Sequence, residues 1–406
     1  MAIAWSGWKD VGMATRGSLE KIFEAAGIET IPAEEGVRMF VDEALRGGKR
    51  RVVCCGSMGV MDRYDSFRAP PLKLPAPMSA LIAEVTRFPF IDRLLDFEED
   101  IRLVSECTLS TEQHPFLLDH AIDGTPYHPG VMALEMFAES ALLLQPEFCL
   151  AGFEDVMFGL PIKLLKGPVV IRTVAEVVRR KRAHLWVKCH LESDLVNSKG
   201  DVFGTPRIHH QALVRLVMKS PDLTRHLAAE LHDSPAIGVP LKGELIHHPG
   251  FIYLRFFHGP RFQSHGGIIA GFGEGQRKGA DGIALMRHQL PKCNQFAAET
   301  AGEPVLLEAL PMLIEAAFQN AGLVTMEADG LMSLPVGIEW SATFRVPEQG
   351  EQLRIRSLQS GVEDGGVSVH DVVVVGDDDA PVIALKGLRL KAMAPLSEDL
   401  KFTLEG

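Results

Sequence analysis

The part of the chain from residue 95 to residue 397 orders its apolar and polar positions in a way that predicts many strands. Between residues 185 and 191, apolar side chains alternate with polar ones or with tryptophan, and a strand buried on one face has this period. Residues 169–178 are rich in β-branched side chains, which favour strands. The apolar runs 372–375 and 382–385 flank Gly-Asp-Asp-Asp, which is typical of a hairpin.

Two apolar segments within this body predict helices instead, at residues 129–144 and 311–323. Both are apolar nearly all round and rich in small residues, and a helix of that kind is buried rather than lying on the surface. Pro311 suits the first turn of the second helix, where its missing N–H is not needed, and Gly322 predicts a C-terminal stop.

The two predicted helices resemble each other. Residues 134–139 read Leu-Glu-Met-Phe-Ala-Glu and residues 314–319 read Ile-Glu-Ala-Ala-Phe-Gln. Glu135 and Glu315 therefore occupy matching places, at an offset of 180 residues (315 − 135). We interpret this as an internal duplication of two units, each a sheet wrapped around one buried helix.

A different pattern precedes the strand-rich body. Residues 33–45 have apolar side chains at helical spacing, and a strand-like segment follows at 51–55. Four prolines then fall within eight residues, which removes backbone donors and predicts a stiff, extended linker. The predicted organisation is an N-terminal part at 1–68, a linker at 69–94, a first unit at 95–235 and a second unit at 236–397.

Composition narrows the classes of function. Lys plus Arg number 41 and Asp plus Glu number 53, a net charge of −12, and this acidic balance argues against a nucleic-acid binder. The apolar runs are too short to cross a bilayer and the first residues show no signal peptide, so we expect no membrane and a cytoplasmic location. Six scattered cysteines without a CxxC pair predict neither a disulfide framework nor a metal site.

The segment around His120 offers the strongest candidate chemistry. His120 is followed by Gly124 and then by Pro129, and Pro129-Gly130 opens the first buried helix. Free backbone N–H groups at a helix start can hold partial negative charge. An imidazole beside them could take a proton next to a carbonyl whose oxygen they stabilise. From the residues alone, a loop of structural histidines explains the same segment equally well.

A second candidate lies in the second helix, where Glu315 and Gln319 share one helical face inside an apolar stretch. A carboxyl buried there should have a raised pKa and could stay protonated near neutrality, as a general acid must, while Gln319 orients it. A half-buried polar face that contacts water is the open alternative. Glu135 and Glu139 occupy the matching places in the first helix, and we favour Glu315 because a glutamine accompanies it.

Together these residues resemble the dehydratase domains of polyketide synthases and polyunsaturated fatty acid synthases. The family's HxxxGxxxxP motif is complete at His120, Gly124 and Pro129. Residues 334–340 are similar to its Leu-Pro-Phe-x-Trp segment, and Glu315 with Gln319 to its Asp-x-x-x-Gln/His motif. Its Tyr-Gly-Pro-x-Phe-Gln segment has a counterpart with histidine in place of tyrosine, which contains His258, Gly259, Pro260, Phe262 and Gln263.

This resemblance implies an α+β double hotdog, two fused hotdog units that each wrap an antiparallel sheet around a central helix. It implies a dehydratase that eliminates water from a β-hydroxyacyl thioester to give an α,β-unsaturated acyl thioester. His120 would remove the α-proton and Glu315 would protonate the β-hydroxyl. Gln319 would hold the carboxyl, and the N–H groups of Gly130 and Val131 would bind the thioester oxygen. The substrate pocket would be lined by Gly124, Pro129, His258, Gly259, Pro260, Phe262 and Trp340.

The resemblance also implies partners. The substrate would arrive on the phosphopantetheine arm of acyl carrier protein, other synthase domains would be partners, and a homodimer is compatible with the family. No metal or organic cofactor is expected, because the thioester already acidifies the α-position.

The first residues have a resemblance of their own. Residues 3–8 and 12–14 are similar to the end of a ketoreductase domain from the same synthases, with its final helix at 34–45. Residues 1–68 contain no dinucleotide glycine fingerprint and no Ser-Tyr-Lys set, so this part is not expected to reduce a substrate. A ketoreductase end before a dehydratase resembles the order in polyunsaturated fatty acid synthase subunits, and implies a piece of a larger synthase.

Two alternatives remain open at this point. The first is a hotdog thioesterase or isomerase that acts on related acyl thioesters. The second is a catalytically silent dehydratase-like module that docks partner domains, which the histidine at 258 and the glutamate at 315 both leave open.

Overall fold

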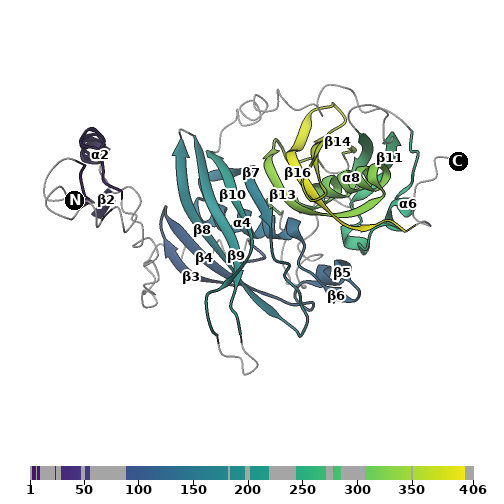
Figure 1. Ribbon diagram of the computed structural model, residues 1–406, viewed down its shortest axis with the longest axis horizontal. Coiled ribbons are helices and arrows are strands. Elements are labelled where there is room, and N and C mark those ends of the chain that lie inside the picture. The colour runs from purple at the N-terminus through teal and green to yellow at the C-terminus, as the bar shows by residue number, and fades with distance from the viewer. Residues whose placement is uncertain are drawn as a thin grey trace. The chain divides into compact units, whose positions relative to one another are not determined.

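The chain divides into two compact units, Met1–Leu72 and Lys73–Gly406. The computed structural model describes residues 2–5, 7–9, 23, 29–46, 51–54, 88–181, 183–196, 202–218, 244–270, 278–284, 307–348 and 351–397 (Figure 1). The second unit contains the strand-rich body that the sequence predicts.

The strands and the helix described in the N-terminal unit follow in the order strand, helix, strand. β1 (Ala2–Trp5) pairs in parallel with β2 (Arg51–Cys54), and α2 (Ala33–Arg46) lies between them in the chain. Parallel neighbours need a crossover of this kind, because a tight turn cannot join them. The helix predicted at 33–45 is confirmed, and the strand predicted at 51–55 is confirmed over Arg51–Cys54, while residues 12–14 of the ketoreductase-like segment lie outside the described residues.

The second unit consists of two halves with the same kinds of element. The first half contains β3 (Arg93–Glu98), β4 (Arg102–Leu109), η3 (Pro115–Asp119), β5 (Ala121–Ile122), β6 (Thr125–Pro126), α4 (Gly130–Leu144), β7 (Phe148–Phe158), β8 (Val169–Lys181), β9 (His184–Ser193) and β10 (Arg207–Met218). The second half contains α6 (Pro249–Tyr253), η5 (Pro260–Phe262), β11 (His265–Ala270), β12 (Gly279–Ala284), α8 (Pro311–Asp329), β13 (Leu331–Thr343), β14 (Leu353–Glu363), β15 (Val367–Val375) and β16 (Pro381–Pro395). Within the described residues each half thus has one long helix, α4 or α8.

One 12-stranded sheet joins the halves, in the order β11-β12-β14-β15-β16-β13-β7-β10-β9-β8-β4-β3. The junction is the antiparallel pair β13–β7, with Ile338 opposite Val156. Outward from this junction, the first half has the order β7, then β10-β9-β8, then β4-β3, and the second half has the matching order β13, then β16-β15-β14, then β12-β11. In each half the strand after the long helix comes first and the half's first two strands come last. This repeated topology confirms the predicted duplication and the double-hotdog fold.

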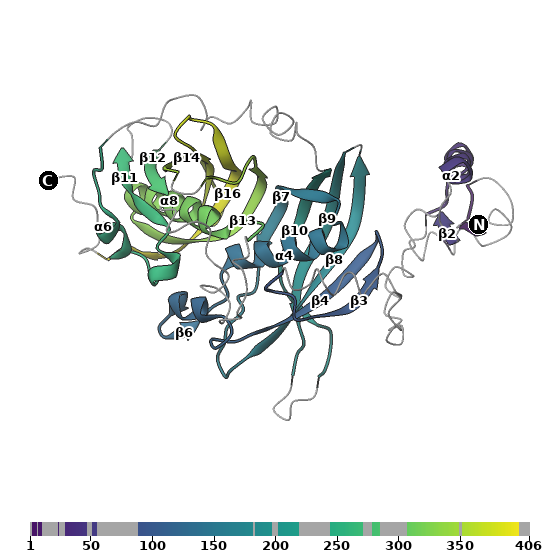
Figure 2. The same cartoon turned by 180° about the vertical axis from the view of Figure 1, so that it is seen from behind.

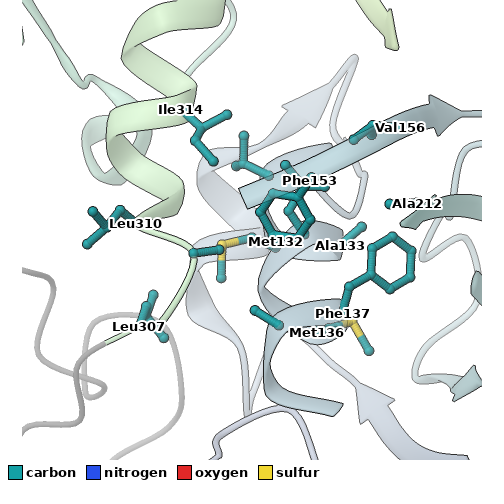
Figure 3. Packing of buried hydrophobic residues seen from close by; sticks show 14 of the residues in the cluster. Met132, Ala133, Met136, Phe137, Phe153, Val156, Ala212, Leu307, Leu310 and Ile314 are labelled. Atoms are coloured by element: carbon teal, nitrogen blue, oxygen red, sulfur yellow. The ribbon is translucent and has the colours of Figure 1, made fainter. Parts of the chain in front are cut away.

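Both long helices are buried, as their apolar character predicts. Each is wrapped by the strands of its own half (Figure 2), and every residue of α4 after Gly130 is buried. Figure 3 shows Leu310 and Ile314, at the start of α8, beside Met132 of α4 in one hydrophobic core. None of the described helices is long and apolar enough to cross a membrane.

The helix α8 is longer than predicted. It continues through Gly322 and ends at Gly330, whose φ of 63° lies in the left-handed region that favours glycine. Gly322 is instead buried in the helix interior, beside Phe256. The predicted stop is wrong because residues 323–326 are buried as well, and that burial outweighs the helix penalty of one glycine, about 1 kcal/mol.

The first half also begins earlier than predicted. The predicted linker runs to residue 94, but Phe88, Phe90 and Ile91 are buried in the main hydrophobic core. The backbone N–H of Phe90 donates to Oε2 of Glu139 at 3.0 Å. The linker boundary at 94 is therefore corrected, because residues 88–91 already belong to the folded half, while residues 69–87 of the predicted linker lie outside the described residues.

Glu135 ties α4 to the segment that leads into α8. Its two carboxyl oxygens accept the backbone N–H groups of Glu308 at 2.8 Å and Ala309 at 2.7 Å. The next residue, Leu310, has a φ of 51°, a left-handed conformation that costs a non-glycine residue roughly 1–2 kcal/mol. Burial raises the pKa of Glu135 to about 8, against the two N–H donors that lower it. This anchor fixes where α8 begins.

Glu139, one turn after Glu135, generates a prediction about stability. Burial first and the charge of Glu135 second raise the pKa of Glu139 well above its ordinary 4.5. The folded chain then keeps a proton that the unfolded chain releases above about pH 4.5, so the free energy of unfolding falls with rising pH by ~1.4 kcal/mol per unit. In Glu139→Gln this contribution disappears.

We therefore expect the unfolding free energy of Glu139→Gln, measured relative to that of the wild type in urea titrations, to increase from about pH 5 to about pH 8. The amide adds a constant cost for its buried NH₂, which shifts the curve without changing its slope. Parallel curves for the two proteins would contradict the assignment of a buried, protonated carboxyl.

Candidate functional site

His120 lies between η3 and β5, and its ring is fixed by one hydrogen bond. Nδ1 is 3.0 Å from the carbonyl oxygen of Tyr127. Because a carbonyl only accepts, Nδ1 carries the hydrogen and Nε2 presents a lone pair. Burial lowers the pKa of His120 to about 4, against the Tyr127 hydrogen bond, which raises it. Near neutral pH this side chain is therefore a neutral imidazole whose basic atom is Nε2.

Glu315 and Gln319 lie one turn apart on α8, and both side chains are buried. Nε2 of Gln319 donates to Oε1 of Glu315 at 2.8 Å and to the carbonyl oxygen of Phe262 at 2.7 Å. Burial raises the pKa of Glu315 to about 7, and the hydrogen bond from Gln319 opposes that rise. A large share of this carboxyl is therefore protonated near neutral pH.

His258 lies between these two groups. Its Nε2 is 3.2 Å from Oε1 of Glu315, and both side chains are only 7% exposed. Its ring centre is 5.5 Å from that of His120. Burial, and then the charge of His120, lower the pKa of His258 well below 6.5. The structure thus gathers an imidazole of the first half and a carboxyl of the second half in one buried cluster, with a second imidazole between them.

Aromatic rings surround the two histidines. Phe257 stacks on His258 with ring centres 4.3 Å apart and meets His120 edge-on at 5.0 Å. The ring of Phe262, which is fully buried, lies 5.4 Å from that of His120. These rings take the place of water around the imidazoles, and the loss of water disfavours the charged form of each.

The loops that carry the two histidines are fastened to each other. The N–H of Gly259 donates to the carbonyl oxygen of Asp119 at 2.8 Å, and Arg261 pairs with the Asp119 carboxylate at 2.6 Å. Gly259 has no room for a side chain, since a Cβ there would lie 2.3 Å from Oδ1 and 2.8 Å from Cα of Asp119. Because Asp119 precedes His120 and Gly259 follows His258, this contact sets the spacing of the two rings. Pro260 begins η5 within the same loop.

The start of α4 has the form that the sequence predicts. Pro129 is the N-cap, and its carbonyl oxygen accepts the first hydrogen bonds of the helix. Gly130 and Val131 form the first turn, where backbone N–H groups have no partner within the helix. A Cβ on Gly130 would lie 2.9 Å from the ring of Phe158, so glycine allows this close approach.

The structure corrects two of the predicted pocket residues. Gly124 is exposed at the turn between β5 and β6, where its φ of 74° follows a φ of 49° at Asp123. Glycine serves this turn, because two successive positive φ angles are needed. Trp340 belongs to a separate hydrophobic cluster and lies 5.0 Å below the guanidinium of Arg215. Motif spacing fixes the order of residues along the chain but not the direction of a side chain.

Two residues around the site give almost no signal in the sequence. Asp119 fastens the histidine loops, and its only signal in the sequence is that it precedes His120. Tyr253, in α6, donates its hydroxyl to Oε1 of Gln319 at 2.6 Å, and an isolated tyrosine in an apolar segment gives no such signal. Among the described residues, no three His, Cys, Asp or Glu side chains gather where they could hold a metal ion.

Comparison with known proteins agrees with the fold of the strand-rich unit. Residues 89–187 match the family model described as the polyketide synthase dehydratase domain. The dehydratase domain from the CurF module of curacin polyketide synthase matches with a TM-score of 0.53 and 18% identity, over 75% of this chain and 99% of that one. The strand-rich unit has the fold of a polyketide synthase dehydratase domain. No curated protein matches the chain.

Two further dehydratase structures give the same result. A dehydratase domain of a trans-AT polyketide synthase from Brevibacillus brevis matches with a TM-score of 0.51 and 16% identity, over 75% of this chain and 99% of that one. GphF dehydratase 1 matches with a TM-score of 0.52 and 16% identity, over 76% of this chain and 100% of that one. The resemblance to polyketide synthase dehydratases that the motifs indicated is confirmed, and the ketoreductase resemblance of the N-terminal part stays a prediction.

The contact between Gly259 and Asp119 gives a prediction for this dehydratase-like unit. Gly259→Ala must push the Asp119 loop away, and overpacking of this kind costs about 1–3 kcal/mol. We expect a lower denaturation midpoint in urea. The matched control is Gly250→Ala, in α6, where a Cβ would meet nothing within 4 Å. Equal midpoints for the two variants would show that the loop contact is loose.

Proposed function

We propose that the chain eliminates water from a β-hydroxyacyl thioester to give an α,β-unsaturated acyl thioester. The observation that carries this proposal is the buried cluster in which His120 and Glu315 come from opposite halves, with their pKa values shifted in opposite directions, to about 4 and about 7. Neutral imidazole is the form that can accept a proton, and neutral carboxylic acid is the form that can give one. The double-hotdog fold shared with polyketide synthase dehydratases supports the same reaction.

In the proposed step, Nε2 of His120 removes the α-proton of the substrate. The electrons of that C–H bond form the new double bond as the β C–O bond breaks, and Glu315 gives its proton to the leaving hydroxyl, which departs as water. His120 then carries a proton and Glu315 a negative charge. Return of that proton from the imidazole to the carboxylate restores both groups for the next turnover.

Charge that develops on the thioester oxygen needs donors. The backbone N–H groups of Gly130 and Val131, at the start of α4, are the proposed donors, because this end of a helix carries partial positive charge. Removal of one such donor costs on the order of 10²–10³ in rate in comparable sites. The thioester itself acidifies the α-carbon, so the proposed reaction calls for no metal or organic cofactor.

The proposed partners follow from the fold. Dehydratases of polyketide synthases act beside other synthase domains, so acyl carrier protein, with the substrate on its phosphopantetheine arm, is the proposed carrier. The parallel β1–β2 pair with its crossover helix α2 supports the proposal that the N-terminal unit is the end of a ketoreductase-like domain. Val37 and Phe40 on α2 are exposed, and a larger α/β domain would cover such a face. Assignment to a polyunsaturated fatty acid synthase remains a prediction.

The proposal is tested with a β-hydroxyacyl pantetheine thioester and mass detection of the dehydrated product. We expect His120→Ala and Glu315→Gln each to lose roughly 10²–10⁴-fold in kcat/KM, because each removes one proton-transfer group. The control is Glu327→Gln, which lies on the same helix three turns further on and should retain wild-type turnover. The assignment of roles is wrong if both site variants turn over at the wild-type rate.

The products separate the alternatives in the same assay. Free acid would indicate a thioesterase, and a displaced double bond would indicate an isomerase. Binding of acyl carrier protein without dehydration of any chain length would indicate a silent docking module.

The pH dependence follows from the two pKa values. kcat/KM should rise as His120 loses its proton through about pH 4 and fall as Glu315 loses its proton through about pH 7, since this ratio reports the free enzyme. Initial rates from about pH 5 to about pH 9 measure the falling limb. In Glu315→Gln the residual rate should lack that limb, and a wild-type rate that rises through neutrality would exclude Glu315 as the acid.

A further inference from the structure

A directed chain of hydrogen bonds leads from the backbone of β11 to the carboxyl of Glu315. It starts at the N–H of His265, which lies 2.6 Å from the hydroxyl oxygen of Tyr253. A backbone N–H can only donate, so the tyrosine oxygen accepts there. Its own hydrogen is then directed to Oε1 of Gln319, at 2.6 Å.

The same chain fixes the amide of Gln319. Its oxygen accepts from Tyr253, so its NH₂ group faces the other way, toward two acceptors. One is the carbonyl oxygen of Phe262, at 2.7 Å, which cannot donate. The other is Oε1 of Glu315, at 2.8 Å. The amide is thus held between a donor on one side and a pure acceptor on the other, and only one of its two flipped orientations satisfies both.

The orientation of Gln319 decides which oxygen of Glu315 is an acceptor. Oε1 receives the N–H of Gln319, and Nε2 of His258 also lies 3.2 Å from this same oxygen. In a neutral carboxylic acid the carbonyl oxygen is the stronger acceptor, and the hydroxyl oxygen bears the hydrogen. With Oε1 occupied as an acceptor, the hydrogen belongs on Oε2.

We propose that Tyr253 is a positioning residue of this site, which acts through Gln319 to keep Oε1 of Glu315 as an acceptor and leave the transferable proton on Oε2. The inference rests on the proposed function, because it names the oxygen from which the departing hydroxyl would be protonated. Tyr253 itself touches no reacting atom in this scheme. Its effect is to hold the acid in one of two protonation patterns.

The group that donates to Tyr253 is itself held in place by further hydrogen bonds. Its donor, the N–H of His265, belongs to β11, and the His265 ring is held in turn by Oδ1 of Asn320 at 2.8 Å and by the N–H of Gly267 at 3.1 Å. Asn320 follows Gln319 on α8. The strand β11 and the helix α8 are therefore joined twice, through the hydroxyl of Tyr253 and through the His265–Asn320 hydrogen bond. The hydroxyl therefore has a fixed place from which to hold the amide.

The test is Tyr253→Phe, which keeps the ring and removes the hydroxyl. Gln319 then loses the donor that its amide oxygen faces, and its N–H is held less firmly on Glu315. We expect kcat to fall by roughly 10- to 100-fold with KM unchanged, as for a misplaced catalytic group. The falling limb of the pH profile should move to higher pH, because a weaker donor stabilises the carboxylate less.

Two comparisons separate positioning from a general loss of structure. In a Gln319→Ala background, Tyr253→Phe should cost no further activity, since a residue that acts only through Gln319 has nothing left to act on. The matched control is Thr325→Val, which removes another buried hydroxyl of the same helix, bonded to Ser368 at 3.1 Å and His370 at 3.2 Å. Thr325→Val should lower the stability of the protein but leave the falling limb of the pH profile at its wild-type position.

An unmoved limb in Tyr253→Phe, or additive losses in the double variant, would overturn the inference while leaving the proposed function intact. If the wild type does not dehydrate any thioester, the proposed function fails, and the titration of the Glu315 carboxyl decides the inference alone. That titration is read by infrared difference spectroscopy of the carboxyl band, identified by its loss in Glu315→Gln. A carboxyl titration at the same pH in wild type and Tyr253→Phe would overturn the inference.

Discussion

Removal of water from ionisable side chains at the contact between the two halves is the constraint on which the site depends. Burial is the largest influence on both groups, and it lowers the pKa of His120 while it raises the pKa of Glu315. Desolvation disfavours each charged form, so one cause leaves a neutral base beside a neutral acid. Phe262 of the second half packs against both His120 and Phe116 of the first. The base is thus buried by the half that supplies the acid, so neither half alone would hold it in this state.

The sequence predicts the fold well where the pattern of apolar residues alone decides the structure. Apolar residues all round predict that α4 and α8 are buried, and the runs that flank residues 376–379 pair as expected, with Val374 opposite Ile383. Prediction fails where a local signal competes with tertiary burial. Gly322 reads as a helix end but lies in the core, and Phe88 and Phe90, which fall within the predicted linker, are buried in the core. Those outcomes depend on neighbours that are distant in the chain.

The candidate site likewise contains residues that the sequence predicts and contacts that it does not. Spacing along the chain predicts His120 as a candidate group because it begins one motif. It predicts Glu315 and Gln319 because the two lie one helical turn apart. It does not predict the contact of His258 with Glu315 or the hydrogen bond from Tyr253 to Gln319, because these join segments that only the fold brings together. Nor does spacing predict the direction of a hydrogen bond, since that direction depends on which partner is a backbone group that can only donate or only accept.

The duplicated helices show how one position acquires two roles. Glu135 and Glu315 match in sequence, yet both oxygens of Glu135 are held by backbone N–H groups, while both contacts found for Glu315 fall on Oε1. Two fixed donors make an anchor, whereas donors on a single oxygen leave the other to exchange a proton. The residue one turn later reinforces the difference. Glu139 adds a second buried carboxyl, whose pKa the charge of Glu135 helps to raise, and Gln319 adds an N–H that orients its neighbour without competing for the proton.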